Sequence, residues 1–431
     1  MADESPPGAL TGVRVLEFSQ IVAGPVAGVA LSDFGADVIK VEPLHGESRR
    51  NSAAVVPNEG KYFQSLNRGK RSLTVDLQSS TGRALIRRLV PTFDVVLINY
   101  RAGVAERLGI DYASLAKLHP ALIYASITGF GETGPYARRG GSDIVAQAYT
   151  GLMAAEAKVD EFGAPSQITS TTLIDRSSGL AAAMAICAAL YHRSQTGQGQ
   201  ELQVSLLHTA LDLLAHQVMR EPVHDATLRD SFVAELQAKR ASGARYDQIA
   251  ALRKAQAPRF ASHRLYYGGY HTREGALVLG ALTQHNRDAV RAILGMADGT
   301  DAAGFNAADP GSRARIESWR AEIQEKLLAR TAAEWVEQFL QAGVPASVVN
   351  FPEEMADDIQ VQAAGMMAEL EHEVTGPQRV VAPIVRMSAT PTRASAAAPP
   401  LAAHTREVLH EAGLSEAEIE ALAASGAISI A

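Results

Sequence analysis

The sequence has few of the groups on which many enzyme classes depend. Cys187 is the only cysteine among 431 residues, so no intrachain disulfide can form, and a reducing cytoplasm is the simplest compartment for the chain. The 12 histidines show no His-Glu-x-x-His pattern and no other metal-ligand spacing, which argues against a metal site. We therefore expect neither a bound metal nor a tightly bound cofactor.

Common nucleotide and hydrolase motifs are also missing where they would be expected. No Gly-x-Gly-x-x-Gly fingerprint follows the first predicted strand, and the chain has no Walker loop and no Gly-x-Ser-x-Gly elbow. A classical dinucleotide enzyme, a P-loop nucleotidase and an elbow-type serine hydrolase are therefore not supported.

Long apolar runs and a strong net charge are absent as well. The longest apolar stretch, Leu180–Leu190, is too short to span a bilayer, and we interpret it as part of a buried helix. Met1–Leu10 contains Asp, Glu and Pro where a signal peptide would be basic and then apolar. The net charge of −7 gives no general attraction for nucleic acid or an anionic membrane, so we expect neither as a partner.

What the first half does contain is an alternation of strand and helix patterns. The predicted strands are Val13–Phe18, Asp37–Glu42, Ser72–Leu77, Asp94–Asn99 and Ala121–Ile127. The predicted helices are Val26–Phe34, Ser80–Leu89, Tyr112–Leu118, Asp175–Arg193 and Leu207–Val218. This order predicts an α/β fold with a parallel, open, Rossmann-like sheet.

The character of the chain changes after residue 220. Residues 220–259 are charged and poor in strand formers, and strand patterns return at His263–Thr272 and Ala276–Leu282. We therefore predict a small α+β domain at 221–328 and a large domain made of 1–220 and 329–431. Near the end, the Pro- and Ala-rich segment Thr390–Ala403 is interpreted as an extended surface arm.

Asp175 stands at the start of the long apolar helix, and its carboxylate has two interpretations. It could be a helix-terminal charge that complements the helix dipole, which from the residues alone is the commoner case. It could also be a nucleophile that attacks an activated acyl group and forms an anhydride.

Two loops carry similar ambiguity. The basic run Asn67–Arg71 has a glycine between its charges, and is either a solvated loop or a phosphate-binding loop. Gly129–Pro135 follows a predicted strand, and is either a simple turn or a ligand loop at the carboxyl end of the sheet.

Taken in order, a series of segments resembles the family III CoA-transferases of the CaiB/BaiF type, and the resemblance covers nearly the whole chain. The segments are Leu10–Pro25, Asp33–Glu42, Asn67–Leu77, Ile98–Tyr112, Gly129–Asp143, Thr196–Leu211, Tyr270–Gly275, Ala342–Asn350 and Gly413–Leu422. The resemblance places the family's catalytic aspartate on Asp175, which favours the nucleophile. It also implies an interlocked homodimer whose large domain comes from both chain ends.

The resemblance further implies that a coenzyme A thioester is bound as substrate in the large domain. The matching CoA positions are Val75, Asn99, Tyr100, Arg107 and Leu108. We add Gln20 and Val22, since backbone amides of the Gln20–Gly24 loop could stabilise an oxyanion.

The sequence departs from the family pattern at several points. Two family lysines correspond to Gln78 and to the vicinity of Gly140, where Arg138 and Arg139 could compensate. No glycine run matches the loop that closes over oxalate in formyl-CoA:oxalate CoA-transferase, which makes oxalate a poor acceptor.

The resemblance therefore predicts an enzyme that moves CoA between carboxylic acids, with short dicarboxylic acyl groups such as succinyl or mesaconyl as preferred substrates. Residues of the small domain could contact a dicarboxylate or could be packing residues: His263, Arg264, Tyr266, Tyr267 and Tyr270. Three alternatives stay open: intramolecular transfer on one dicarboxylic acid, α-methylacyl-CoA racemisation and non-enzymatic CoA binding. A racemase needs a histidine where Ser142 stands.

Overall fold

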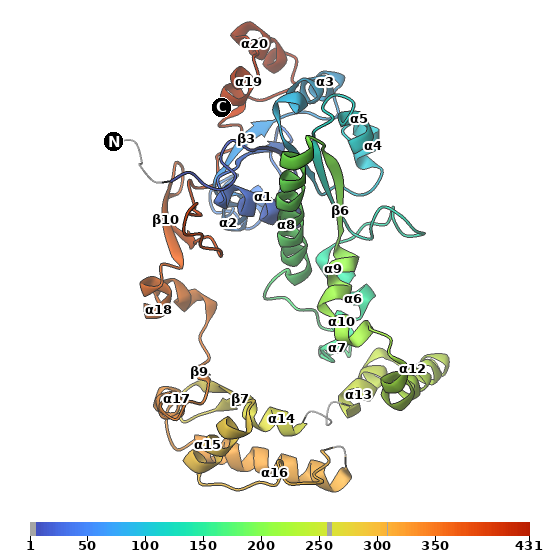
Figure 1. The fold of residues 1–431 in the computed structure, drawn as a ribbon, viewed down its shortest axis with the longest axis vertical. Coiled ribbons are helices and arrows are strands. Elements are labelled where there is room, and N and C mark those ends of the chain that lie inside the picture. The colour runs from blue at the N-terminus through green and yellow to red at the C-terminus, as the bar shows by residue number, and fades with distance from the viewer. Residues whose placement is uncertain (1–5, 257–260, 308) are drawn as a thin grey trace. The chain divides into compact units, whose positions relative to one another are not determined.

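A six-stranded parallel sheet organises the larger part of the computed structural model, which describes residues 6–256, 261–307 and 309–431 (Figure 1). The strands are β1 (Arg14–Phe18), β2 (Asp37–Glu42), β3 (Lys70–Thr74), β4 (Val95–Ile98), β5 (Ile123–Thr128) and β6 (Gln200–Ser205). Their order is β3-β2-β1-β4-β5-β6, and every neighbouring pair is parallel. This is the doubly wound order, in which ligands bind where the order reverses, between β1 and β4. The predicted parallel, Rossmann-like sheet is confirmed.

Helices connect the strands as parallel crossovers require. They are α1 (Ala23–Asp33), α2 (Lys61–Asn67), α3 (Ser80–Leu89), α4 (Val104–Leu108), α5 (Tyr112–Leu115), α6 (Asp143–Thr150), α7 (Leu152–Ala155), α8 (Leu173–Thr196), α9 (Leu206–Leu213) and α10 (Ala215–Val218). A Cβ atom on Gly179 of α8 would lie 2.4 Å from the carbonyl oxygen of Ala23. The close packing of α8 on α1 therefore depends on a glycine at this position.

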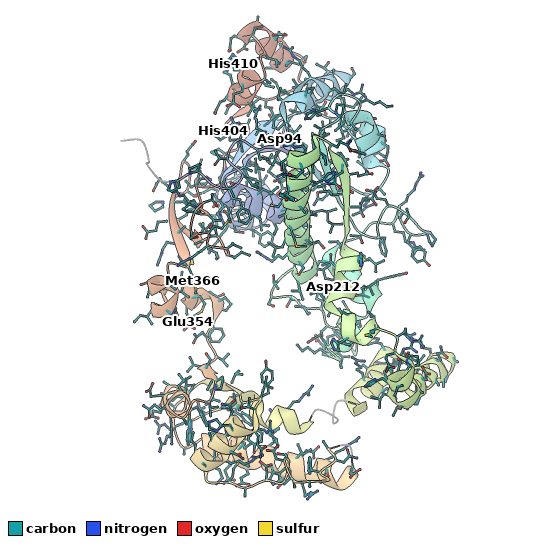
Figure 2. All side chains as sticks on the ribbon, viewed as in Figure 1. Asp94, Asp212, Glu354, Met366, His404 and His410 are labelled. Carbon is teal, nitrogen blue, oxygen red and sulfur yellow. The ribbon has the colours of Figure 1, made fainter. Side chains whose placement is uncertain are left out.

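The long helix α8 is buried on one face only. Ile174, Ala182 and Ile186 belong to the core, whereas Met184 and Tyr191 are more than two-thirds exposed within this chain. By length and composition alone α8 could cross a membrane, but a core helix of a soluble protein passes the same test. At the far end of α8, Arg193 bonds to the carboxylate of Asp94, which also accepts from the backbone of Arg14. Asp94 is labelled in Figure 2.

Both ends of the chain contribute to the same core. The C-terminal helices α19 (Thr405–Glu411) and α20 (Glu416–Ala424) bring Val408, Leu409 and Ile419 into the cluster that contains Leu16 and Phe18 of β1. Figure 1 shows these red helices beside the blue and cyan elements of the first half. Before these C-terminal helices along the chain come the helix α18 (Ile359–Ala363) and an antiparallel hairpin of β10 (Met367–His372) and β11 (Gly376–Val381).

The segment 390–403 is extended, but it is not the surface arm that we predicted. Ala398 and Ala402 are buried, and the backbone of the segment bonds to Gly69 and to the hydroxyl of Ser72. Proline and alanine suit this position because a proline has no N–H to satisfy and an alanine side chain needs little room.

The chain divides into two units, and 154–166 and 221–358 form the second one. Its elements are α11 (Pro222–His224), α12 (Asp230–Ala241), α13 (Tyr246–Gln256), α14 (Ala261–Tyr266), β7 (Tyr267–His271), β8 (Ala276–Gly280), α15 (Gln284–Leu294), α16 (Pro310–Leu327), α17 (Ala332–Gln341) and β9 (Ala346–Val348). The strands form an antiparallel sheet in the order β7-β8-β9.

Two details of this unit differ from the sequence expectation. The boundary at 328 falls too early, because Trp335 and Phe339 of α17 lie in the core of this unit and β9 pairs with β8. The strand predicted at His263–Thr272 begins as the helix α14 and becomes β7 at Tyr267, directly before Gly268 and Gly269, because glycine disfavours a helix interior.

Candidate active site

A cavity of about 730 Å³ opens at the carboxyl ends of the parallel strands. Residues that directly follow β1, β2, β3, β4 and β5 all contribute to its lining, among them Gln20, Pro43, Val75, Asn99 and Gly129. Open α/β sheets bind their ligands at this edge. The cavity lies entirely within the first unit of the chain.

Asp175 lines this cavity from the first turn of α8. Asp175 is the acidic residue in the first turn of this helix, but another carboxylate accepts the hydrogen bonds of the helix amides there. Asp143 of α6 accepts hydrogen bonds from the amides of Ile174 and Asp175, at 2.8 and 3.1 Å. Among the described residues, none makes a hydrogen bond or an ion pair with the side chain of Asp175. Its carboxyl group is therefore free for chemistry.

The surroundings of Asp175 favour its neutral form. Burial, and after it the negative charge of Asp143, raises the pKa of Asp175 to about 7, whereas the Arg49 cation acts in the opposite direction. A carboxyl group that titrates near neutral pH in a cavity is typical of a functional site.

The loop opposite, Gln20–Gly24, is fastened on both sides. Asn99 accepts from the amide of Gln20 at 2.9 Å and donates to its carbonyl oxygen at 2.7 Å. Glu47 accepts from the amide of Ile21 at 3.1 Å. Ile21 has φ of 72°, which a β-branched residue rarely adopts and which costs about 1–3 kcal/mol. The surrounding contacts therefore hold this loop in a strained conformation.

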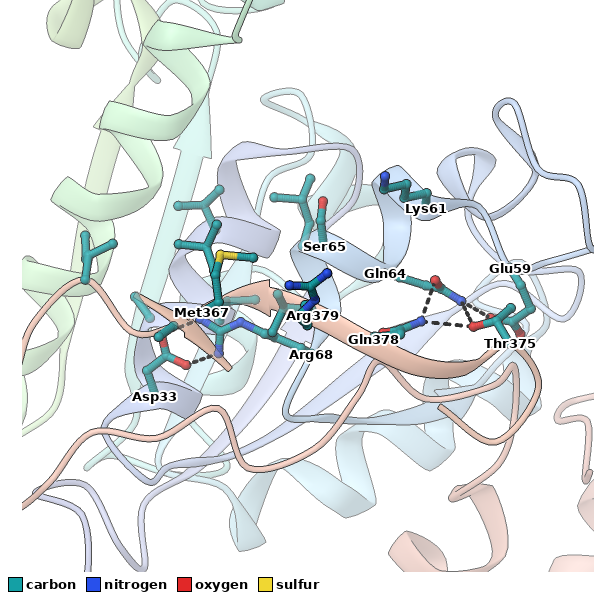
Figure 3. Close-up of a pocket in the computed structure, with 18 of the residues that line it drawn as sticks. Asp33, Glu59, Lys61, Gln64, Ser65, Arg68, Met367, Thr375, Gln378 and Arg379 are labelled. Carbon is teal, nitrogen blue, oxygen red and sulfur yellow. Dashed lines mark hydrogen bonds and ion pairs between the residues drawn. The ribbon is translucent and has the colours of Figure 1, made fainter. Parts of the chain in front are cut away.

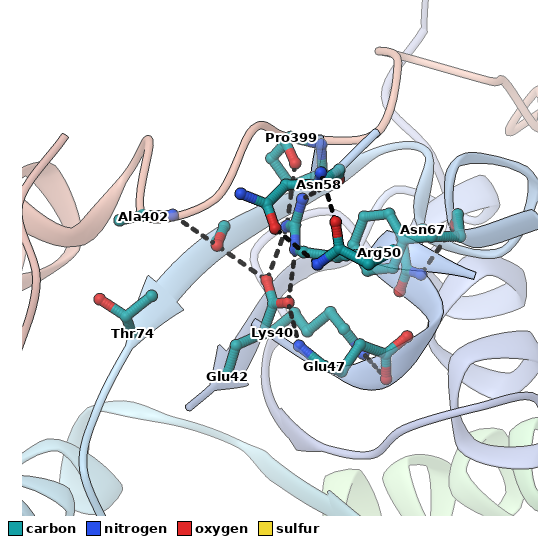
Figure 4. A network of polar contacts seen from close by, with 12 residues as sticks. Lys40, Glu42, Glu47, Arg50, Asn58, Asn67, Thr74, Pro399 and Ala402 are labelled. Carbon is teal, nitrogen blue, oxygen red and sulfur yellow. Dashed lines mark hydrogen bonds and ion pairs between the residues drawn. The ribbon is translucent and has the colours of Figure 1, made fainter. Parts of the chain in front are cut away.

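A buried ionic network adjoins this loop, and Figure 4 shows its members Lys40, Glu42, Glu47 and Arg50. Lys40 of β2 is fully buried and donates to the carbonyl oxygen of Ser19 at 2.8 Å, and it lies 3.4 and 3.5 Å from Glu17 and Glu47. Arg50 completes the network with two 2.7 Å bonds to Glu42. A buried ion that loses its partner costs several kcal/mol of folding free energy. The side chains of this network are therefore held close to their partners.

The basic run Asn67–Arg71 joins these internal pairs instead of binding phosphate. Lys70 bonds to Glu17 at 3.0 Å and burial lowers the pKa of its ammonium group to about 8. Arg68 pairs with Asp33 in a two-pronged contact. Neither expectation for this run, a solvated loop or a phosphate loop, describes it.

The cavity gathers most of the site residues expected from the sequence. Its lining includes Asp175 together with Val75, Asn99, Tyr100, Leu108, Gln20 and Val22. Arg107 is exposed on α4 and is not among the lining residues, so its contact with CoA stays a prediction. The lining instead includes Arg101, whose guanidinium carbon lies 2.8 Å from where a Cβ atom of Gly140 would be. Arg101 thus places a positive charge beside Gly140, in whose vicinity the sequence resemblance puts one of the family's lysines.

Other expected residues have different positions. Ser142 and Gln78 line the cavity, whereas Arg139 stacks on Tyr136 at 3.6 Å from the ring centre and lies outside the lining, as does Arg138. In the second unit, Tyr266 and Tyr270 are buried core residues. The packing interpretation therefore holds for these two tyrosines; the side chain of His263 lies outside those described.

A second cavity of about 770 Å³ lies between α1, α2, α8 and the hairpin β10–β11 (Figure 3). Apolar residues such as Val55, Leu180 and Ile384 make up much of its lining. Its polar groups are largely paired with one another: Arg68 with Asp33, and Gln64 with Thr375. It therefore offers less reactive chemistry than the cavity that contains Asp175.

No motif or spacing in the sequence singles out Glu47, Arg49, Arg101 or Asp143. Each is a charged residue in or next to a loop, and such residues are usually solvated. The one usable signal is the position of Asp143 at the end of the glycine-rich segment Gly129–Asp143, because the helix α6 that it begins was not predicted.

The fold and this cavity define an α/β protein with a ligand site in the crevice of a doubly wound sheet. The model of CoA-transferase family III matches residues 10–405. A succinate–glutarate CoA-transferase from Agrobacterium fabrum is 34% identical over 95% of this chain and 97% of that protein. A succinyl-CoA:mesaconate CoA-transferase from Haloarcula marismortui is 30% identical over 94% and 97%.

A solved structure has the same architecture. A CAIB/BAIF family protein from Brucella suis superposes with a TM-score of 0.73 at 29% identity, and the match covers 94% of this chain and all of that one. The chain belongs to CoA-transferase family III and is an enzyme of that family, as the sequence resemblance predicted.

Proposed function

We propose that this enzyme moves CoA between short dicarboxylic acids, with Asp175 as covalent nucleophile. The observation that carries the proposal is that Asp175 has a free carboxyl group in the same cavity as the expected CoA positions, while Asp143 caps the helix in its place. The relatives named for succinate, glutarate and mesaconate favour dicarboxylic substrates for this enzyme too.

The reaction begins when the Asp175 carboxylate attacks the thioester carbonyl of the donor. The carbon–sulfur bond breaks, CoA leaves as a thiolate, and an aspartyl–acyl anhydride forms. The thiolate then attacks the aspartyl carbonyl, which releases the donor acid and leaves an aspartyl-CoA thioester. The acceptor carboxylate attacks this thioester to give a second anhydride, and the thiolate takes the acceptor acyl group and frees Asp175. Each step replaces one leaving group by one nucleophile.

Oxyanion stabilisation belongs to the last part of the Gln20–Gly24 loop. The amides of Gln20 and Ile21 already donate to Asn99 and Glu47. The amides of Val22 and Ala23 come at the start of α1, where a helix leaves its first N–H groups without intrahelical acceptors. Both residues line the cavity, so their amides are the oxyanion donors in this proposal.

We also propose that the enzyme works as an interlocked homodimer in a reducing cytoplasm. The dimer follows from the family resemblance, and the compartment from the single cysteine, Cys187.

The test is mass spectrometry of acyl-CoA products. The purified enzyme is incubated with succinyl-CoA, glutaryl-CoA and mesaconyl-CoA, each with and without free dicarboxylic acids, beside Asp175→Ala and Asp175→Asn. Products that need the added acid and disappear in both variants support the proposal. An isomeric ester formed without added acid would mean intramolecular transfer. Inversion at the α-carbon would mean racemisation, and turnover by Asp175→Ala would contradict the nucleophile.

A further inference from the structure

His45 is a basic residue in the active-site cavity to which the proposed reaction gives no part. It belongs to the loop that follows β2, it is exposed, and it lines the cavity that contains Asp175. Among the residues that the structure describes, none forms a hydrogen bond or an ion pair with its imidazole ring. The ring nitrogens are therefore available to a ligand in the cavity.

A CoA thioester brings several negative charges, since its nucleotide part has a diphosphate and a 3′-phosphate. The net charge of the chain is −7, so these phosphates need local cations. In the described lining of the cavity, only His45 and Arg101 are basic. The resemblance places a CoA-binding lysine of the family at position 78, where this chain has the neutral Gln78. His45 is therefore the one basic residue that the described lining offers besides Arg101.

The loop that carries His45 lies between the expected CoA positions. The strand order places β2 between β3 and β1, and β4 on the other side of β1. Val75 follows β3, and its amide donates to the carbonyl oxygen of Glu42 at the end of β2, at 2.8 Å. Asn99 and Tyr100 follow β4. A ligand that contacts both groups of residues passes the loop after β2.

The same order places this loop at the nucleotide end of the cavity. The amide of Asp175 donates to Asp143, at the start of the helix α6, which follows β5. The strands β2 and β5 are three places apart, roughly 14 Å at the usual strand spacing. Because the thioester must reach Asp175, the nucleotide of CoA belongs at the other end.

The fold class also indicates which phosphate His45 would meet. In doubly wound folds, a residue about 20 positions after the first βα turn reaches the ribose of a bound nucleotide, and a cation near it accommodates a phosphate on that ribose. His45 has this place in the chain, in the loop after the second strand. In CoA the phosphate on the ribose is the 3′-phosphate.

The carboxylates near this loop are occupied by other groups. Glu42 accepts two hydrogen bonds of 2.7 Å from the guanidinium group of Arg50. Asp76 accepts from the amide of Gln78 at 2.9 Å. His45 thus stays free to donate a hydrogen bond to a phosphate oxygen.

We propose that His45 binds the 3′-phosphate of CoA, so that the enzyme distinguishes CoA from 3′-dephospho-CoA. The proposal rests on the proposed function for the identity of the ligand in this cavity. It assigns His45 to binding and leaves the chemical steps to Asp175, so loss of His45 affects KM for the acyl-CoA and not kcat.

The experiment compares CoA with 3′-dephospho-CoA, which lacks only this phosphate. Titration calorimetry gives the affinity of the full-length enzyme for both, and kcat/KM is measured with their succinyl esters and saturating glutarate. For His45→Ala, we expect affinity and kcat/KM to fall by about 10-fold for CoA and its ester, and by less than about 2-fold for the dephospho forms. His45→Lys restores a cation and should keep most of the preference for CoA.

A matched control separates this site from histidine loss in general. His285→Ala removes an exposed histidine of α15, which lies outside the cavity lining. It should change the affinity for neither ligand.

The comparison isolates the 3′-phosphate from the rest of CoA. Equal losses for both ligands in His45→Ala, or no loss for either, would overturn the role of His45 and leave CoA transfer intact. A wild-type enzyme that bound both ligands equally would overturn it as well. If the wild type bound CoA but transferred it to no acid, the proposed function would fail, while the affinities would still decide the role of His45. Binding of neither ligand would contradict both.

Discussion

Two carboxylates at one helix terminus have different surroundings and therefore different roles. Asp143 is buried and accepts two backbone hydrogen bonds, so its charge is satisfied. Asp175 is turned into the cavity without such partners, and burial together with the charge of Asp143 raises its pKa to about 7. Neighbouring carboxyl groups in such different environments often have different chemical roles, and one of them is commonly the acid, base or nucleophile of an active site.

The first prediction concerns the pH dependence of the reaction. Only the ionised form of Asp175 is a nucleophile, so kcat/KM should rise with pH through an apparent pKa near 7. Asp143→Asn keeps an oxygen acceptor for the two helix amides but removes the like charge. The acid limb should then move to lower pH, by on the order of one unit. Initial rates between pH 5.5 and 9 measure this, and an unchanged limb would contradict the coupling between the two carboxylates.

The second prediction concerns stability. The folded-state pKa of Asp175 is about 7, above the unfolded value of about 3.9, so the native state binds more protons between these values. Stability from this group is therefore lost as pH rises from about 4 to 7. Asp175→Asn should melt at a higher temperature than wild type at pH 8, and the gain should shrink at pH 5. The control Glu325→Gln changes an exposed carboxylate and should show no such trend; a gain for Asp175→Asn that did not depend on pH would contradict the argument.

At the scale of elements, the loop Gln20–Gly24 after β1 depends on hydrogen bonds with Asn99 and Glu47 for its conformation. Removing Glu47 with Glu47→Ala leaves the amide of Ile21 without its acceptor and the strained φ without its constraint. Because the next amides would act on the transition state, we expect kcat to fall by about 10²-fold with little change in KM for the acyl-CoA.

Two companion variants separate geometry from general damage. Glu47→Gln keeps an acceptor for Ile21 and should recover much of the activity. Ile21→Gly adopts φ near 72° without strain and should stay close to wild type. Steady-state kinetics and melting temperatures are measured for all three. If Glu47→Ala lowered the melting temperature but left kcat unchanged, the loop would have no positioning role.

The sequence could predict those elements whose patterns are strong by themselves. The apolar runs Val13–Phe18 and Asp94–Asn99 became β1 and β4 within a residue or two, because a fully buried parallel strand has few alternatives. The hairpin β10–β11 was not predicted although its strands pair only with each other, because charged residues such as Glu369, Glu371 and Arg379 interrupt its apolar pattern. The segment 390–403 was misassigned for a different reason, since its burial depends on tertiary contacts with β3.

The candidate site was predictable to a different extent. Family motifs located Asp175 and four of the residues that line its cavity, and the oxyanion argument added Gln20 and Val22. The residues that determine how Asp175 behaves, Asp143 and Arg49, could not be found in this way, because their role depends on distances across the fold and not on spacing along the chain. Arg107 shows the converse, since a matching motif position is exposed outside the lining.

At the scale of the whole molecule, the exposed apolar residues of the first unit bear on the proposed homodimer. Leu180, Met184 and Tyr191 are exposed on α8 although they lie on a helix with a buried face. A second copy of the chain would cover such residues, and in an interlocked dimer it could not leave without unfolding.

The last prediction therefore joins mass and stability. Light scattering after gel filtration should give twice the chain mass of 45.7 kDa, and this mass should persist at nanomolar concentration. In urea, loss of the dimer and loss of far-UV circular dichroism should occur together, at a midpoint that rises with protein concentration. A dimer whose protomers are stable alone would release folded monomers first, on dilution or at lower urea. Folded monomers under either condition would therefore contradict interlocking, because threaded chains cannot separate while both remain folded.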